Sequence, residues 1–111
     1  MSKVLYMNSK IESSVSFNAQ IALVIRAVRT ALAWSQQDLA TKTNISKPTI
    51  ARLESMSMSP RADTINNLFC VLRAEGVEID ILAEEIIVRF KKVAILELQN
   101  NLAQPKSSED N

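Results

Sequence analysis

Apolar residues between positions 17 and 76 recur at intervals of three and four, the spacing that places side chains on one face of an α-helix. The first such pattern runs from Phe17 to Ala33 and predicts a long amphipathic helix. A later one, INNLFCVLRAEG, predicts a helix that begins at or near Asp63 and is ended by Gly76, the only glycine of the chain. The residues on these two faces are Phe17, Ile21, Val24, Ile25, Val28 and Leu32, and Ile65, Leu68, Phe69 and Leu72.

Between these patterns the stretch WSQQDLATKTNISKPTIARLE, residues 34–54, predicts two short helices joined by a tight turn. Ser35 and Ser46 are each placed to cap a helix N-terminus through the hydroxyl oxygen. Asn44 lies at the turn, and Asn tolerates the left-handed backbone conformation that such a turn requires. Pro48 falls in the first turn of the second helix, where a backbone N–H has no helical partner. Ile50 and Leu53 then face inward with Leu39 and Ala40, and Lys47, Thr49 and Arg52 remain on the outer face.

Beyond Gly76 the hydrophobic period changes from that of a helix to that of a strand. Apolar residues alternate with polar ones over 77–81, the sequence LAEE intervenes, and alternation resumes over 86–91, which predicts a β-hairpin. Residues 91–103 predict either a last helix or a continuation of the strand, and the length and the Asn-Asn pair favour a helix. Residues 105–111 contain no core-forming side chain and predict a disordered tail.

An isolated two-stranded hairpin is marginally stable in water. It must therefore pair with the N-terminal segment, with the helical core or with the same element of a second subunit. We favour the subunit interface, because sheet-edge pairing across a two-fold axis satisfies exposed backbone groups and produces a dimer. Residues 1–16 predict a short strand near 3–7, or an arm that reaches DNA through Lys3 or Lys10.

Composition narrows the function classes. The chain of 111 residues is the size of one domain, has one cysteine and no histidine, and contains no run of apolar residues long enough to span a membrane. These features predict a cytoplasmic protein without a disulfide, a metal site or a cofactor, and no group of residues suggests an enzyme. Cys70, within the run Leu68 to Leu72, is expected to be a small buried residue, and Trp34 is expected in the core rather than stacked on a base.

Charge is distributed unevenly along the chain. Residues 1–60 hold seven Lys or Arg against three Asp or Glu, and residues 61–111 hold six against nine, so the net charge of +1 divides into +4 and −3. Positive charge is therefore concentrated in the half that contains the two short helices, as a surface facing phosphates needs.

The residues from Ser35 to Glu54 resemble the helix-turn-helix of the Cro/C-repressor (XRE) family of bacterial and phage regulators. The resemblance extends over about 17–76 and includes the Ser-Gln opening, the small Ala40 and the Thr-Ile-x-Arg-x-Glu run. Asn44 and Met56 stand where that family often has glycine. The resemblance implies a mainly α, lambda-repressor-like domain of four to five helices, with an ion pair between Arg29 and Glu54 that holds the first helix to the recognition helix.

The same resemblance implies a site for double-stranded DNA. The helix from Lys47 to Ser55 is expected in the major groove, where each base pair presents a distinct pattern of donors and acceptors. We expect contacts to bases from Lys47, Pro48, Thr49 and Arg52, and contacts to phosphates from Gln36, Ser46 and Arg61.

We therefore expect a homodimeric repressor of a phage or mobile element that reads an inverted repeat. Its expected parts are an arm or strand over 1–16, the DNA-binding domain over 17–76, a hairpin and helix for dimerisation over 77–104, and the tail. The alternative is an antitoxin that binds a toxin and regulates its own operon. A toxin or an antirepressor is thus a candidate protein partner, and no membrane is involved.

Overall fold

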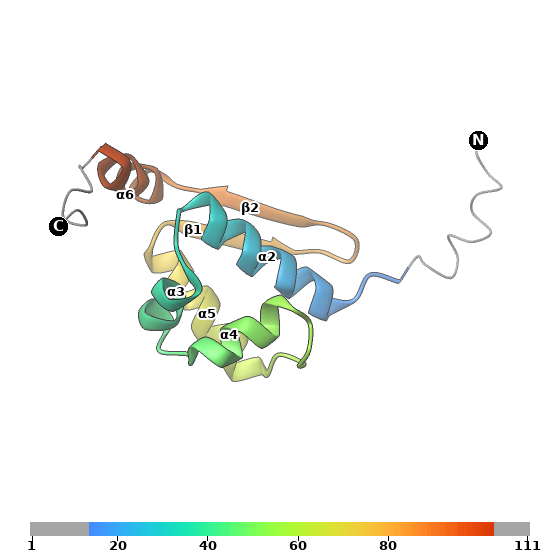
Figure 1. Ribbon diagram of the computed structural model, residues 1–111. Coiled ribbons are helices and arrows are strands. Elements are labelled where there is room, and N and C mark those ends of the chain that lie inside the picture. The colour runs from blue at the N-terminus through green and yellow to red at the C-terminus, as the bar shows by residue number, and fades with distance from the viewer. Residues whose placement is uncertain (1–13, 104–111) are drawn as a thin grey trace.

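The computed structural model describes residues 14–103, and within them the chain forms five helices and one antiparallel hairpin (Figure 1). The mainly α fold with a C-terminal hairpin and a final helix is therefore confirmed. The expected strand near residues 3–7 and the expected tail at 105–111 lie outside the described residues. The elements are α2 (Phe17–Ala31), α3 (Gln36–Thr43), α4 (Lys47–Glu54), α5 (Ala62–Ala74), β1 (Val77–Ile81), β2 (Ile86–Phe90) and α6 (Lys92–Ala103).

Helix α2 begins where the Ser16 hydroxyl accepts a hydrogen bond from the Ala19 N–H at 3.0 Å. It ends two residues earlier than the apolar pattern predicts. Ala33 has a φ of 62°, in the left-handed region, and this reversal takes the chain out of the helix before Trp34. Phe17 was expected on the buried face but is 47% exposed, because it lies in the first turn, beyond the end of the core.

The core lies where α2, α3, α4 and α5 meet. Trp34 is buried there, as expected, and the ammonium of Lys42 lies 4.9 Å from the centre of its ring, within the range of a cation–π contact. Burying large apolar side chains is the main favourable contribution to folding a chain of this size. The side chains with less than 2% exposure include Ile21, Ile25, Leu39, Ile50, Leu53, Leu68, Leu72 and Val77.

Helix α5 buries Leu68 and Leu72 fully and Ile65 and Phe69 in part, as the spacing predicts. The expectation for Cys70 was wrong, because this thiol is exposed. Cys70 is two positions from both Leu68 and Leu72. Two positions along an α-helix correspond to a rotation of roughly 200°, so Cys70 lies on the opposite side of the helix. The apolar character of its neighbours in sequence does not indicate burial unless the helical period is applied.

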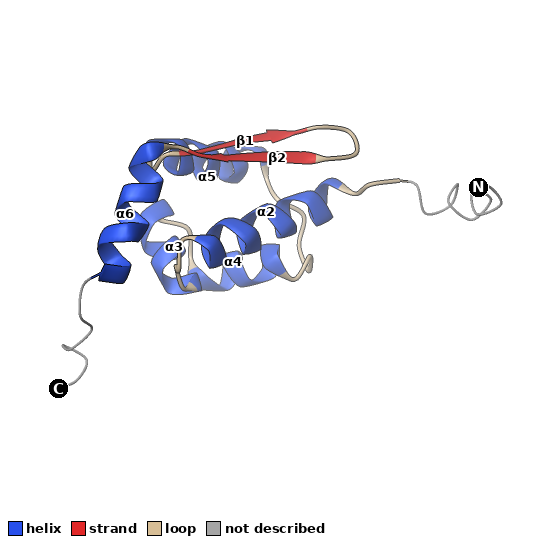
Figure 2. Ribbon diagram, turned by 90° about the horizontal axis from the view of Figure 1, so that it is seen from above, coloured by secondary structure: helices blue, strands red, loops and turns tan. Residues whose placement is uncertain are grey.

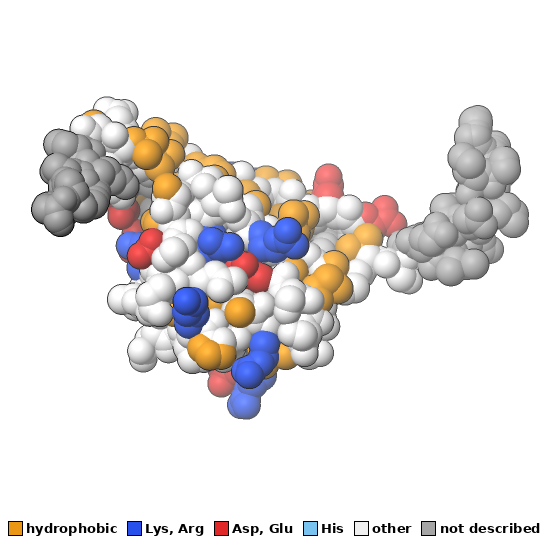
Figure 3. Space-filling model, viewed as in Figure 1, with side chains coloured by type: hydrophobic (Ala, Val, Ile, Leu, Met, Phe, Trp, Pro, Cys, Tyr) orange, Lys and Arg blue, Asp and Glu red, His pale blue; other side chains and the backbone are white. Residues whose placement is uncertain are grey.

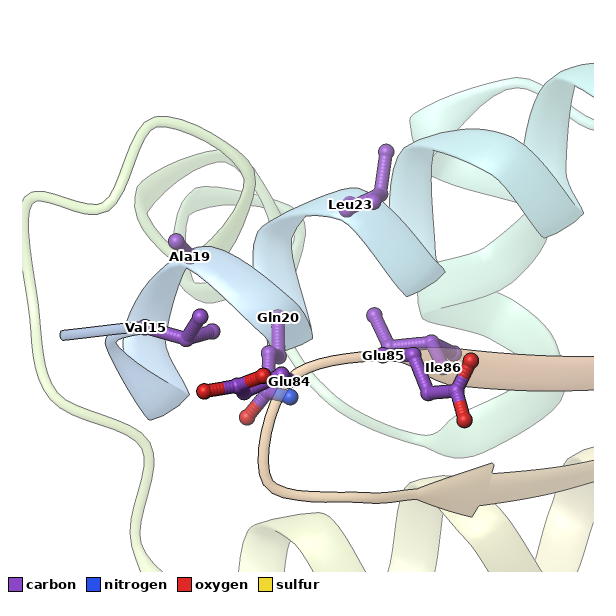
Figure 4. Close-up of a pocket in the computed structure, with 7 residues that line it drawn as sticks. All are labelled: Val15, Ala19, Gln20, Leu23, Glu84, Glu85 and Ile86. Atoms are coloured by element: carbon purple, nitrogen blue, oxygen red, sulfur yellow. The ribbon is translucent and has the colours of Figure 1, made fainter. Parts of the chain in front are cut away.

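Strands β1 and β2 pair in antiparallel register from Val77 with Phe90 to Ile81 with Ile86. The hairpin lies along α5 and α2, so pairing with the helical core, one of the three alternatives, is what the structure shows (Figures 1 and 2). A partly buried hydrogen bond supports this docking: Gln20 Nε2 donates to the carbonyl oxygen of Leu82 at 2.7 Å. Figure 4 shows Gln20 reaching from α2 to the hairpin turn, beside Glu84. Pairing between subunits remains a prediction.

The last segment is a helix, which decides between the two predicted alternatives for residues 91–103. Gly76, with a φ of 92°, lies between α5 and β1 and against the first turn of α6. A Cβ on Gly76 would collide with Cγ1 of Val93 and with the backbone nitrogen of Ala94, so no larger residue fits without a shift. Ala94 is the fully buried residue of α6, and Lys42 of α3 lies 3.8 Å from carboxylate oxygens of both Glu75 and Glu97.

Candidate nucleic-acid interface

Helices α3 and α4 are joined by a turn whose backbone is set by capping side chains. Ser35 and Asp38 form a capping box, in which the serine hydroxyl accepts from the Asp38 N–H and the carboxylate accepts from the Ser35 N–H. Asn44 ends α3 in the left-handed conformation at φ 59° and ψ 30°, as predicted. Ser46 caps α4 and accepts from the Thr49 N–H at 3.2 Å. These caps satisfy N–H groups that a helix start otherwise leaves unpaired.

Helix α4 has one buried and one open face. Ile50 and Leu53 are at most 1% exposed and hold the helix against the core. Lys47, Pro48 and Arg52 are exposed on the other face, and within residues 14–103 neither Lys47 nor Arg52 has an ion-pair partner. Two cationic groups are thus presented to solvent from a rigidly docked helix about 12 Å long.

The hydroxyl groups of Thr49 and Ser46 are less available for contact with another molecule than the charged groups of Lys47 and Arg52. Their hydroxyl oxygens lie 2.8 Å apart in a mutual hydrogen bond, and Thr49 is half-buried. A hydroxyl that donates within this pair still has an acceptor lone pair, and the Thr49 methyl remains available for apolar contact. The expected contacts of both residues stay predictions.

The Arg29 guanidinium binds Glu54 with two hydrogen bonds, from Nε to Oε2 at 2.6 Å and from Nη2 to Oε1 at 3.0 Å. This is the bidentate geometry in which Arg and carboxylate interact most strongly. Nη1 of Arg29 also donates to the carbonyl oxygen of Trp34 at 3.1 Å, where the chain leaves α2. One side chain therefore connects α2, the start of α3 and the end of α4.

Gln36 was expected to contact phosphate. In the structure its side-chain amide is hydrogen-bonded to Glu54, with Nε2 donating to Oε1 at 3.0 Å. Sequence reasoning missed this contact, because it depends on how α3 crosses α4. An amide nitrogen carries two protons, so one N–H of Gln36 is still available to a phosphate oxygen. The Glu54 carboxylate thus accepts hydrogen bonds from two side chains that come from two different helices.

Burial alone would raise the pKa of Glu54. The hydrogen bonds from Arg29 and Gln36, together with the positive charges of Arg29 and Arg26, outweigh burial and lower the pKa of this carboxyl below its ordinary value. The hydrogen bond from Arg29 to Glu54 likewise raises the pKa of the guanidinium, which burial opposes. The pair is therefore ionised at neutral pH.

The loop after α4 begins with Met56 in the left-handed conformation at φ 62°, at the position where the resembled family often has glycine. Its turn is closed by backbone bonds from the Met56 N–H to the Leu53 carbonyl and from the Ser57 N–H to the Arg52 carbonyl. Arg61, at the far end of this loop, has a side chain 76% exposed and lies 3.6 Å from the Asp63 carboxylate. A surface ion pair of this length is weak, so Arg61 can turn to another anion.

The surface around the turn is concave and contains both polar and apolar side chains. A hollow of about 490 Å³ lies between α3 and α4 and is bordered by Gln37, Thr41, Asn44 and Lys47 among others. Figure 3 shows Lys and Arg side chains spread over the helical part of the molecule, between uncharged polar surface. Within residues 14–103 no three His, Cys, Asp or Glu side chains are grouped so as to hold a metal ion, and no helix is long and apolar enough to cross a membrane.

Comparison with models of protein families gives a match. The model of a family described as helix-turn-helix matches residues 25–79, from the middle of α2 to the middle of β1. The match includes both short helices, the turn between them and the Arg29–Glu54 pair. No curated protein and no solved structure matches the chain.

Proposed function

Residues 25–79 belong to the helix-turn-helix family, of the Cro/C-repressor (XRE) type, and from that premise we propose that the protein is a homodimeric repressor that reads an inverted repeat in double-stranded DNA. Membership supports a DNA-binding transcription regulator, and the family is generally non-enzymatic. The dimer, the repression and the identity of the contacting residues are the proposed part.

The observation that carries the proposal is the two-sided character of α4. Its inner face is fixed by Ile50 and Leu53, and its outer face presents Lys47 and Arg52 without an ion-pair partner among the described residues. A helix fixed on one side and cationic on the other is suited to entering the major groove, which admits one α-helix.

In the proposed complex, each residue of α4 has a distinct role. Arg52 forks onto the O6 and N7 atoms of a guanine, and Lys47, at the helix N-terminus, reaches guanine or phosphate. Pro48 makes only apolar contact, and Thr49 offers its methyl group to thymine or its hydroxyl to a base edge. These contacts carry the sequence preference.

Other residues fix the position of the protein on the duplex. Gln36 and Ser46 border the two helix N-termini, where backbone N–H groups and the helix dipole attract phosphate. Arg61 reaches the backbone from the loop before α5. Contacts of this kind set the register and carry no base information themselves.

Two copies are needed because one helix reads few base pairs. A symmetric dimer places its recognition helices about 34 Å apart, one turn of B-DNA, and matches an inverted repeat. The uneven charge of the chain, +4 over residues 1–60 and −3 over 61–111, supports a DNA-facing half and a half that faces away.

Fluorescence anisotropy tests this proposal, with labelled DNA from upstream of the protein's own gene, excess random competitor and two salt concentrations. We expect binding that survives the competitor, with a log–log salt slope of about −0.9 for each phosphate neutralised. Arg73→Ala, which removes an exposed arginine of α5 outside the interface, is the matched control and should bind as the wild type does. Complete loss of binding under competitor, on this DNA and on a randomised pool, contradicts sequence-specific recognition.

A further inference from the structure

The apolar surface of the molecule is concentrated at its C-terminal helix. Eleven large hydrophobic side chains are exposed among the described residues, and five of them lie between residues 90 and 102: Phe90, Val93, Ile95, Leu96 and Leu102. Ile95 and Leu102 are 53% and 65% exposed. Figure 3 shows hydrophobic side chains gathered over the α6 end of the molecule. Val93 and Leu96 lie about 100° or more around the helix axis from Ile95 and Leu102, so the apolar patch on one side of α6 consists of Phe90, Ile95 and Leu102. Exposed apolar surface of this kind marks an interaction site.

The patch continues into a hollow of about 350 Å³ between α6 and the end of α2. Its lining is apolar throughout: Ala31, Leu32, Phe90, Ile95 and Leu98. Helix α6 uses its other side for its own chain, through Ala94 and through Glu97 beside Lys42. Lys92, Ile95, Gln99 and Leu102 are spaced by three, four and three residues and so share one outward stripe beside this hollow.

Charges at the ends of α6 indicate what covers this stripe. Lys92 is the first residue of the helix, no acidic residue lies in the first turn, and no basic residue lies in the last. The N-terminus of a helix carries partial positive charge and the C-terminus partial negative charge, so Lys92 is unfavourable at its own end. An antiparallel second helix with the same sequence reverses this, because it brings each Lys92 to the partner's C-terminal carbonyl groups.

We propose that the stripe Lys92–Ile95–Gln99–Leu102 binds the same stripe of a second copy of this chain, antiparallel and across a two-fold axis. Ile95 then lies against Leu102 of the partner subunit, and Gln99 lies at the axis beside its own symmetry mate. The hollow lined by Leu32 and Phe90 accommodates the partner's apolar side chains at the edge of this contact. The inference rests on the proposed homodimer and names its interface.

The position of α6 agrees with this assignment. Figures 1 and 2 place α6 at the end of the molecule opposite the hairpin turn, beside α3 and the end of α2, so a copy docked there leaves the outer face of α4 open. The outer face of the sheet is less suitable, because it carries the cross-strand pairs Asp80 with Arg89 at 2.7 Å and Glu78 with Lys91 at 3.9 Å. Charged pairs that are already satisfied gain little from a partner.

Sedimentation equilibrium without DNA tests the interface. Ile95→Glu combined with Leu102→Glu places four carboxylates in the contact and should weaken the dimer by about a hundredfold or more. Leu23→Glu, at a leucine 59% exposed near the other end of the molecule, is the matched control and should leave the dimer unchanged. Circular dichroism establishes that each variant is folded. A wild type that stays monomeric, or a double variant that dimerises normally, overturns the proposal.

Lys92→Glu separates this interface from a merely structural role of α6. A glutamate at the helix N-terminus should raise the thermal midpoint of the single chain, yet it should weaken the dimer by about tenfold or more, because it faces the partner's C-terminal carbonyls. A variant that is more stable and equally dimeric contradicts the antiparallel arrangement.

Cross-linking tests the register. In a Cys70→Ser background, Gln99→Cys should oxidise to a disulfide-linked dimer, and Asn100→Cys, about 100° around the helix, should do so far less. Equal cross-linking at both positions refutes the register. These readouts need no DNA. A dimer through α6 that binds no operator would contradict the proposed function alone. A double variant that still dimerises and binds DNA specifically would contradict this inference alone, because another surface would then form the dimer. Recovery of a heterologous small protein on α6 in place of a second copy would overturn it.

Discussion

Arg29 and Glu54 are joined by two hydrogen bonds of 2.6 and 3.0 Å, although 25 residues separate them in sequence. Arg29 is near the end of α2 and Glu54 is the last residue of α4, so this pair fixes the helix that presents Arg52 to the helix that carries much of the core. The side chain of Glu54 is 9% exposed and that of Arg29 is 21% exposed, which leaves water little access to the pair.

We expect Glu54→Gln to lower the free energy of unfolding by about 2 to 3 kcal/mol, because it leaves a largely buried guanidinium without its counter-charge. Urea denaturation at pH 7 measures the loss. Arg73→Ala, which removes an exposed arginine of α5 that forms no ion pair within residues 14–103, is the control and should stay within about 0.5 kcal/mol of the wild type. Equal losses in the two variants would show that the pair has no special contribution.

The lowered pKa of Glu54 gives stability a defined pH dependence. Its contribution is complete above the ordinary carboxyl pKa of 4.5 and is lost as pH falls through the lower pKa of the folded state. Glu54→Gln should therefore reduce the loss of stability between pH 5 and more acidic buffers. Denaturant midpoints measured across this range test the slope, and an unchanged slope contradicts the assignment.

Glu75 provides a control, because its pKa is shifted in the direction opposite to that of Glu54. Burial and the neighbouring Glu97 raise the pKa of Glu75, although Lys42 opposes them. Its contribution is therefore complete below the ordinary pKa and is lost as pH rises through the raised pKa. Glu75→Gln should make the acid-induced loss of stability steeper than in the wild type, where Glu54→Gln makes it shallower.

Met56 holds a left-handed backbone conformation that costs a residue with a Cβ about 1 to 2 kcal/mol. Met56→Gly removes this cost but increases the entropy of the unfolded chain, so we expect a net gain of about 0.5 kcal/mol. Ala27→Gly is the matched control: it is an exposed residue in the interior of α2 and should lose about 1 kcal/mol. Thermal unfolding compares the two, and destabilisation by both would mean that Met56 side-chain contacts outweigh the backbone strain.

The local elements of this fold could be predicted from the sequence because their causes are local. Ser35, Asn44 and Ser46 determine the caps and turn by side-chain chemistry acting over three residues or fewer. The alternation from Val77 to Phe90 determines the hairpin in the same way. The error at Cys70 came from reading an apolar run without its helical period.

Contacts between different helices and strands were harder to predict from the sequence. The ion pair of Arg29 and Glu54 was expected from the family resemblance. No local pattern in the sequence predicts that Gln36 donates a hydrogen bond to the same carboxylate. The sequence also could not predict that Ile95 and Leu102 are exposed, because apolar residues at helical spacing form the same pattern whether they face the protein's own core or another molecule.

Arg52 should determine base preference. We expect Arg52→Ala to cost about 1 to 3 kcal/mol on the preferred operator and less on random DNA, because a bidentate contact to guanine is worth that much discrimination. Arg61→Ala, on the loop, should weaken both DNAs alike and reduce the magnitude of the salt slope by about 0.9. Anisotropy titrations on both DNAs compare the variants, and equal losses for Arg52→Ala would refute its base-reading role.

Gln36 tests whether one amide can serve both the fold and the DNA. Its Nε2 already donates one proton to Glu54 at 3.0 Å, and the second proton is available to a phosphate oxygen. Gln36→Ala should therefore lower the free energy of unfolding by about 1 kcal/mol and also reduce the magnitude of the salt slope of operator binding. Gln37→Ala, which removes the neighbouring exposed amide, should change neither by as much, because Gln37 bonds only to Thr41 on its own helix among the described residues. A Gln36→Ala variant that loses stability but keeps the full salt slope would assign Gln36 to the support of Glu54 alone, and the phosphate contact would then belong to the backbone N–H groups at the start of α3.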